Sequence, residues 1–383
     1  MTPRATGRVP ALTGIRTVAA LGVCLTHAAY WTGHYTDDYL GRLLSRFEVG
    51  VALFFVLSGF LLFSPWVRAL HDARADAPAK YPPLGRYAWH RARRILPAYW
   101  LTVIAVYVIF LFRTDTSEFG QGWSGLLRNL TFTQVYGLGH LHTGLTQMWS
   151  MAAEVAYYVA LPAVAWLIAH LACRGRWRPD LLLVCLGALL LISPIWTVVT
   201  HGSAGIDFTA RLWPPAFASW FVGGMILAVL ARLVTSWPAL PSVGAAVIAF
   251  VISGGAIAGE PTIVPLETGA ALVKHTLYLV VAVGLIAPLA IGRDAGTADD
   301  WWSRFCGSRP MVWLGEISYE FFLVHVMVLE FVMDLLGYSV FTGSTAAAFL
   351  VTSAISVPVA WVLHRITAPL WRVSPRRDFR TRR

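Results

Sequence analysis

An arginine and a histidine stand inside the first hydrophobic segment of the chain, which runs from Leu12 to Trp31. Arg16 and His27 are eleven residues apart, so a helix brings both to nearly the same face, about 16 Å apart along its axis. A charged side chain inside a membrane costs at least ~2.5–3.5 kcal/mol on insertion scales, and such residues usually serve a function. The spacing suits an anionic ligand at one end of the helix and an acid–base step at the other.

Three more ionisable residues stand in or beside later hydrophobic segments. Arg91 and Arg94 are three residues apart, so they share a helix face, and guanidinium groups suit phosphates. Anchoring by the positive-inside rule is the alternative explanation for both. We expect Glu154 to lie at the depth of His27, where a carboxylate would orient and charge the imidazole for base catalysis. A protonated Glu154 bonded to a neighbouring helix is the alternative.

The segment WLGEISYEFFLVHVMV carries further polar residues. Tyr319 falls near its middle and His325 in its outer half, at about the depth expected for His27. His325 is a rival base or a residue that positions a substrate. A structural histidine bonded to a neighbouring carbonyl group is the alternative.

Composition identifies a polytopic membrane protein. The chain is 57% hydrophobic and 13% charged, with a mean hydropathy of +0.62, whereas soluble domains carry about 25% charged residues. The net charge of +10 follows membrane topology, so it does not indicate nucleic-acid binding. His140 and His142 lie two apart without further ligands nearby in the sequence, and the four cysteines lack ligand spacing, so we expect no metal site.

Hydrophobic runs predict an all-α fold of about ten transmembrane helices. Of the 30 basic residues, 23 fall in the segments assigned to the cytoplasm and five in external loops, so we expect both termini in the cytoplasm. The predicted spans are 12–31, 50–67, 95–112, 148–170, 180–199, 213–231, 242–258, 268–291, 311–336 and 345–364.

The chain is predicted to form a single transmembrane domain over residues 1–371. Residues 372–383 form a basic cytoplasmic tail that is too polar to pack, and we expect it to be disordered. Apolar residues at helical spacing in the external loop 113–147 predict a short helix at the outer surface. Ser58 and Gly59 are small residues that would allow a second helix to approach closely.

Five motifs together resemble the bacterial membrane-bound acyltransferase family, acyltransferase type 3. They are an arginine followed by ten residues and a histidine, GVALFFVLSGFLL, an RxxR followed by ILPAYW, WSMAAEVAYYVALP, and SYEFFLVH. Members of this family move acyl groups, commonly acetyl, onto envelope sugars, glycolipids and some macrolides. The resemblance covers nearly the whole chain and implies ten core spans. Ala52 departs from it, because the family usually has Asp in GVDLFF.

Carried over by position, the resemblance implies a role for each matched residue. His27 matches the essential histidine of the family and Arg16 its partner arginine. Arg91 and Arg94 match the RxxR, and Glu154 matches the glutamate of the fourth motif.

The resulting hypothesis is O-acyl transfer from a cytosolic acyl-CoA, most simply acetyl-CoA, to a hydroxyl of an envelope sugar or glycolipid at the bacterial cytoplasmic (inner) membrane. Membrane lipids are the other expected partner, and nucleic acid is not. The expected donor-binding residues are Arg16, Arg91 and Arg94, the catalytic ones His27 and Glu154, and those that contact the acceptor His325, Tyr319 and Trp149. The alternatives are acyl transfer to a natural product such as a macrolide, and a transporter or flippase.

Overall fold

The computed structural model of the chain is built from helices and contains no strand within the residues it describes. Those residues are 10–73, 78–113, 120–137, 139–202, 205–261, 266–291 and 300–371. The helices are α1 Pro10–Trp31, α2 Tyr39–Ser45, α3 Gly50–His71, α4 Leu84–Phe110, α5 Gly122–Leu130, α6 Trp149–Leu167, α7 Pro179–Leu190, α8 Ile192–Gly202, α9 Ala218–Leu233, α10 Ala239–Ser253, α11 Thr268–Ala290, α12 Trp301–Cys306, α13 Arg309–Glu316, α14 Ser318–Leu335 and α15 Thr345–Trp371. The short turns that bear on the site are η1 Arg46–Val49, η2 Thr143–Met148 and η3 Ile168–Ala172.

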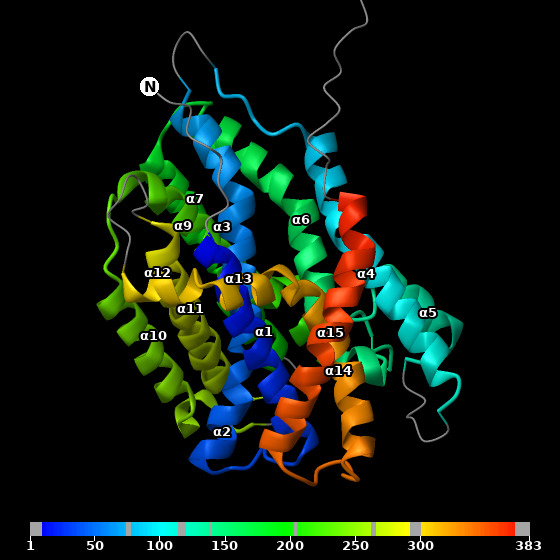
Figure 1. The fold of residues 1–383 in the computed structure, drawn as a ribbon. Helices are drawn as coiled ribbons and strands as arrows, with labels where there is room; N and C mark the ends of the chain where they lie inside the picture. Colours follow the sequence, from blue (N-terminus) through cyan, green and yellow to red (C-terminus); the bar gives the residue numbers. More distant parts are fainter. Residues whose placement is uncertain are drawn as a thin grey trace, which may run out of the picture.

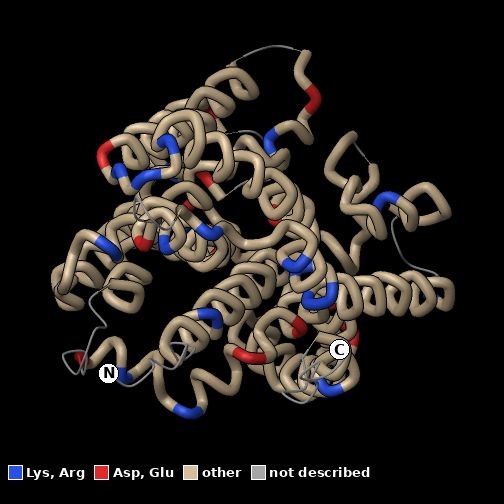
Figure 2. Tube along the Cα trace, turned by 90° about the horizontal axis from the view of Figure 1, so that it is seen from above, with Lys and Arg blue, Asp and Glu red and all other residues tan. Residues whose placement is uncertain are grey.

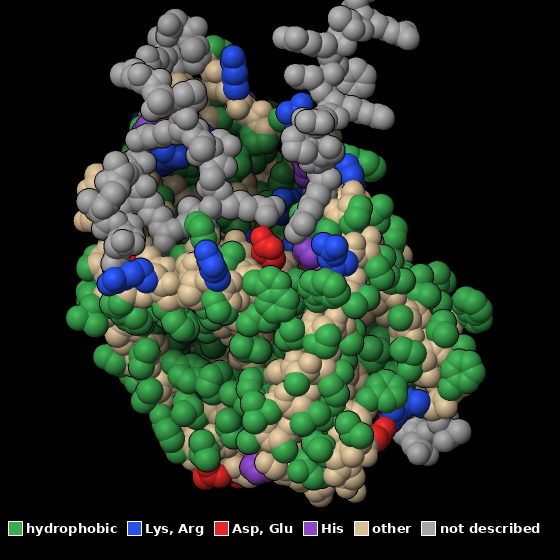
Figure 3. Space-filling model, in the orientation of Figure 1, with side chains coloured by type: hydrophobic (Ala, Val, Ile, Leu, Met, Phe, Trp, Pro, Cys, Tyr) green, Lys and Arg blue, Asp and Glu red, His purple; other side chains and the backbone are tan. Residues whose placement is uncertain are grey.

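The helices confirm an all-α polytopic membrane fold. In the described part of the chain, eight helices are long and apolar enough to cross a membrane, and the bent pair α13 and α14 makes a ninth. The shorter apolar helix α10 corresponds to the predicted span 242–258. Figure 3 shows a broad hydrophobic belt on one face, with charged side chains gathered above it and at its lower edge. The short helix predicted in loop 113–147 is present as α5.

The first and last described helices are antiparallel neighbours: α1 begins and α15 ends toward the upper end of the bundle (Figure 1). Seen from above, some of the Lys and Arg positions lie inside the bundle and not on its rim (Figure 2). Which end faces the cytoplasm stays a prediction from the distribution of basic residues. The predicted tail 372–383 lies outside the described residues.

The predicted span 311–336 is wrong as one straight helix, because α13 and α14 meet at an angle of 70°. Helix α13 instead packs against the beginning of α1, where the Thr17 hydroxyl donates to the carbonyl of Met311 at 2.8 Å. A Cβ atom at Gly315 would collide with the carbonyl of Thr13. The close contact of α13 with α1 therefore depends on a glycine immediately before the bend, and the crossing part of the segment begins at Ser318.

Helices α3 and α9 form the most extensive helix pair through two facing glycines. A Cβ atom at Gly59 would collide with the carbonyl of Phe221, and one at Gly224 would collide with the carbonyl of Val56. The expected close helix approach at Gly59 is confirmed. Small residues allow such contacts, and van der Waals packing then stabilises the helix pair inside a membrane.

We predict that Gly59→Ala destabilises the protein by about 1–3 kcal/mol, the usual cost of an extra methyl group in a packed interior. The measurement is the temperature at which the detergent-solubilised protein loses its folded elution peak. Gly187→Ala is the control, because its Cβ would meet no atom within 4 Å. Equal melting temperatures of the Gly59 variant and wild type would contradict the packing described.

Candidate active site

Three arginines from two helices meet in a small polar chamber of about 110 Å³. Arg16 comes from α1, and Arg91 and Arg94 come from successive turns of α4. Arg16 interacts electrostatically with both of the others. The structure therefore brings together the three arginines that the sequence analysis named as donor-binding residues. Because like charges repel at short range, such a cluster is maintained by opposite charge, either from the protein or from an anionic ligand.

Glu154 supplies one negative charge in this chamber. Its carboxylate accepts a hydrogen bond from Ser58 at 2.8 Å and another from the hydroxyl of Tyr158, and it interacts electrostatically with Arg16 and Arg91. With three guanidinium groups and one carboxylate, the chamber keeps an excess of positive charge. It therefore suits an anionic group with several oxygen acceptors, such as a phosphate.

The expected pairing of Glu154 with His27 is wrong in position, since the hydrogen bonds of Glu154 go to Ser58 and Tyr158. The expected depth of Glu154 requires the residues just before α6 to lie at the outer surface of the membrane. They are instead buried inside the bundle: Gln147 is 1% exposed, and its amide donates to the carbonyl of Leu323 at 2.9 Å. Helix α6 therefore starts deeper than its hydropathy indicates, which brings Glu154 level with the arginines.

His27 is paired with His325, the second predicted imidazole. His325 Nε2 lies 3.1 Å from His27 Nδ1, which is also 2.8 Å from the carbonyl of Val23. His325 Nδ1 lies 2.8 Å from the carbonyl of Phe322, and the His325 side chain is fully buried. The two histidines come from α1 and α14, which are distant in sequence and adjacent in space.

These contacts assign the proton positions in the neutral pair. A carbonyl oxygen only accepts hydrogen bonds, so each ring carries its proton on Nδ1. His325 Nε2 then accepts a share of the Nδ1 proton of His27. The lone pair of His27 is left on Nε2, the nitrogen that these contacts do not use. His27 therefore has an unused lone pair on Nε2, and its contacts with Val23 and His325 fix the orientation of its ring.

Two aromatic rings of the chamber wall pack against each other, and one of them lies near the histidine pair. Phe54 and Phe322 both line the chamber, with their ring centroids 6.1 Å apart in an edge-to-face arrangement. The ring of Phe322 lies 5.7 Å from that of His325. Phe322 therefore lines the chamber and also lies close to the histidine pair.

The two remaining predicted residues differ in their relation to the chamber. Tyr319 lines it, and its hydroxyl donates to the carbonyl of Ile95 at 3.0 Å. Trp149 instead packs against Phe217, with ring centroids 4.8 Å apart. The structure therefore brings Tyr319 to the arginine cluster and places Trp149 in an aromatic group with Phe217.

Sequence reasoning missed Glu48, the carboxylate that interacts electrostatically with His27. Glu48 Oε1 lies 3.0 Å from Lys274 Nζ and accepts a hydrogen bond from Tyr278 at 3.0 Å. Its side chain is 42% exposed. The available signal was Lys274, because a lysine inside a span requires a nearby acid.

The amino-acid sequence also matches a known protein family and several known proteins. A family model described as "Acyltransferase domain" matches residues 9–365. Acyltransferase MdmB of Streptomyces mycarofaciens is 26% identical over 98% of this chain and 95% of its own length. Peptidoglycan O-acetyltransferase OatA of Listeria monocytogenes is 23% identical over 84% of this chain. O-acetyltransferase OatA of Staphylococcus aureus is 21% identical over 85%.

The lengths of these relatives differ. The matched region is 49% of the Listeria protein and 51% of the Staphylococcus protein, so the chain spans about half the length of both. No solved structure matches the chain.

Proposed function

Since the chain belongs to the membrane acyltransferase family, we propose that it moves an acyl group from cytosolic acyl-CoA to a hydroxyl of an envelope sugar or glycolipid. The observation that carries the proposal is the arrangement of α1. Arg16 faces a cationic chamber at one level, and His27 offers a free Nε2 lone pair about 16 Å further along the helix. An extended thioester arm with phosphates at its end fits this separation.

The chamber would hold the donor where its phosphates join the pantetheine arm. Arg91 and Arg94, with Arg16, offer several N–H donors to phosphate oxygens or to the amide groups of the pantetheine arm. The hydrogen bonds from Ser58 and Tyr158 hold the Glu154 carboxylate in place, and its charge attracts Arg16 and Arg91. The thioester would then pass Phe54 and Phe322 to reach the histidine pair.

The transfer step uses His27 as a general base. His27 Nε2 takes the proton of the acceptor hydroxyl while the oxygen attacks the thioester carbonyl carbon. A C–O bond forms and the C–S bond breaks. The thiolate then takes the proton back from the imidazolium and leaves as the CoA thiol. His325 Nε2 and the carbonyl of Val23 share the Nδ1 proton of His27, which stabilises the imidazolium form.

The acetyl group is the simplest acyl group for this proposal, since two of the relatives are named as O-acetyltransferases. A second acceptor class is a hydroxylated natural product such as a macrolide.

The test is release of CoA thiol from acetyl-CoA by the purified protein in nanodiscs, with and without candidate acceptors. We expect slow release that an acceptor accelerates, with acetyl appearing on the acceptor by mass spectrometry. Adding sugar acceptors and hydroxylated macrocycles separately distinguishes the two acceptor classes. A transporter would release no CoA thiol under any of these conditions. If no CoA thiol were released with any acceptor, the proposal would be overturned.

We predict that Glu48→Gln lowers the turnover number about tenfold and leaves donor binding unchanged. The amide keeps the hydrogen bond to Tyr278 but removes the negative charge that stabilises the imidazolium form of His27. Steady-state kinetics with acetyl-CoA measures the effect. Glu260→Gln is the matched control, because Glu260 also pairs with a basic residue, Arg42, on this side of the protein.

A further inference from the structure

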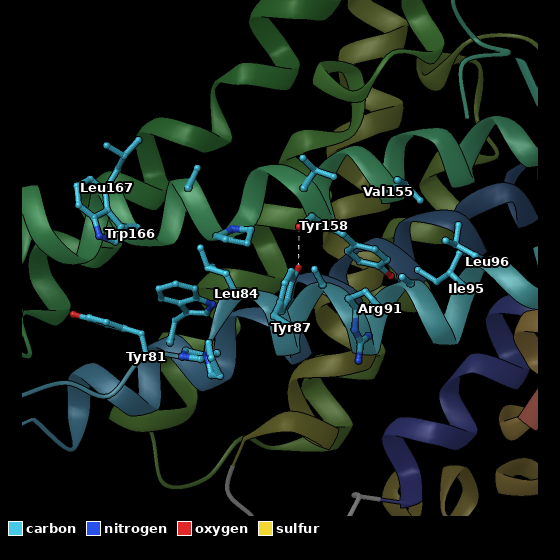
Figure 4. A pocket seen from close by; sticks show the side chains of 18 residues that line it. Tyr81, Leu84, Tyr87, Arg91, Ile95, Leu96, Val155, Tyr158, Trp166 and Leu167 are labelled. Atoms are coloured by element: carbon cyan, nitrogen blue, oxygen red, sulfur yellow. Dashed lines mark hydrogen bonds between the residues drawn. The ribbon is translucent and has the colours of Figure 1, made fainter. Parts of the chain in front are cut away.

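A second, much larger cavity adjoins the arginine chamber. It is a cleft of about 1040 Å³ between α4 and α6, with part of α3 at its base, and Figure 4 shows it at close range. The arginine chamber measures about 110 Å³, whereas pockets for drug-sized ligands measure about 300–1,000 Å³. The chamber is therefore large enough for the pantetheine arm or a phosphate group but too small for a nucleotide, whereas the cleft is large enough for one.

The cleft and the chamber share a wall. Arg91, Ile95 and Tyr158 line both cavities. In the cleft, the hydroxyl of Tyr87 on α4 donates to the backbone carbonyl of Tyr158 on α6 at 3.0 Å (Figure 4). Arg91 therefore lines both cavities, so a ligand in either of them can contact its side chain.

Aromatic rings form much of the cleft wall away from Arg91. Trp66 and Tyr81 are stacked, with ring centroids 5.3 Å apart. Trp166 on α6 also lines the cleft, and both Tyr81 and Trp166 pack against the ring of His170. Flat aromatic side chains are the usual surfaces on which a nucleobase stacks. Tyr87 adds a further ring between this group and Arg91.

Two polar atoms in this wall have no hydrogen-bond partner within the described chain. They are the indole Nε1 of Trp66 and the hydroxyl of Tyr81, both shielded from solvent. A buried donor without a partner costs about 1–3 kcal/mol. A lipid chain cannot satisfy either atom. A base with ring nitrogens as acceptors can, and adenine has such acceptors.

We propose that the cleft between α4 and α6 binds the adenine nucleotide end of the acyl-CoA donor. This inference rests on the proposed function. The base stacks among Trp66, Tyr81 and Trp166, the phosphates meet Arg91 where the two cavities join, and the pantetheine arm continues past Tyr158 into the chamber. The nucleotide is thus held apart from the acyl group, which points toward His27.

The experiment compares two donors that differ only in the nucleotide: acetyl-CoA and acetyl-pantetheine. In Trp166→Ala we expect KM for acetyl-CoA to rise about 5- to 100-fold, the range for one base stacked on one ring. KM for acetyl-pantetheine should stay within about twofold of wild type, which also shows that the variant is folded. Trp361→Ala is the matched control, because Trp361 is 43% exposed and Trp166 49%, and Trp361 lies outside the cleft on α15.

Two further measurements sharpen the result. Tyr81→Phe removes only the hydroxyl group. It should raise KM for acetyl-CoA by a smaller factor than Trp166→Ala does, and leave KM for acetyl-pantetheine unchanged. Free ADP should compete with acetyl-CoA in wild type and less well in Trp166→Ala. Equal changes for both donors, or no competition by ADP, would overturn the inference and leave the proposed function standing. If wild type releases thiol from neither donor, the proposed function fails and this inference fails with it.

Discussion

His27→Gln should lower CoA-thiol release about 10²–10⁴-fold, the usual contribution of a positioned general base. Glutamine has no lone pair on nitrogen that can take a proton from the acceptor hydroxyl. The donor site at the arginines lies about 16 Å away along α1 and should be intact. Acetyl-CoA binding, measured by titration calorimetry on the nanodisc-embedded variant, should therefore stay within about twofold of wild type.

His201→Gln is the control for this variant. His201 makes the same kind of contact on another helix, with its Nδ1 3.0 Å from the carbonyl of Thr197 four residues earlier. His325→Gln should lose less activity than His27→Gln, because in the proposed mechanism His325 orients the base and does not take the proton. The reverse order of the two effects would assign the base to His325. An unchanged rate in both variants would rule out base catalysis by the pair.

Arg91→Gln and Arg94→Gln should raise KM for acetyl-CoA about 10- to 100-fold with a smaller change in the turnover number. Each loses a hydrogen bond from a charged group to the donor, worth about 1.5–3 kcal/mol. Binding is affected more than chemistry because these contacts exist before and during transfer. Steady-state kinetics over a wide range of acetyl-CoA concentrations separates the two parameters.

Arg93→Gln is the matched control on the same helix. Its guanidinium lies 5.5 Å from the ring centroid of Trp89, and the residue does not line the chamber. We expect kinetics close to wild type. If Arg93 and Arg91 variants behaved alike, the arginines would act by anchoring α4 to the membrane surface. A loss of turnover without a change in KM would also contradict a donor-binding role for the chamber.

Residues on one continuous helix were predictable from spacing. Arg16 and His27 share a face of α1, and Arg91 and Arg94 share a face of α4, because helix geometry fixes both relations locally. The cost of burying charge in a membrane made these residues candidates before any fold was known. Hydrophobic length likewise predicted most spans within a few residues of the helices observed.

Contacts between different helices were harder to predict from the sequence. Glu154 was assigned to His27 because the start of α6 was taken to lie at the outer surface, and the burial of η2 reverses that estimate. The bend before Ser318 was missed because a segment with hydropathy typical of one span does not reveal where its axis turns. Glu48 was missed because its partner Lys274 is more than two hundred residues away.

By itself, the sequence determined the class of the protein, the inventory of its ionisable residues and their positions along each helix. Hydrophobicity, charge distribution and helical periodicity are local properties, and they do not depend on which helices are neighbours. Only the tertiary structure decided that Glu154 belongs with the arginines, that His27 pairs with His325, and that an aromatic cleft adjoins Arg91. Depth, bends and contacts between helices are set by packing, and packing depends on the whole chain.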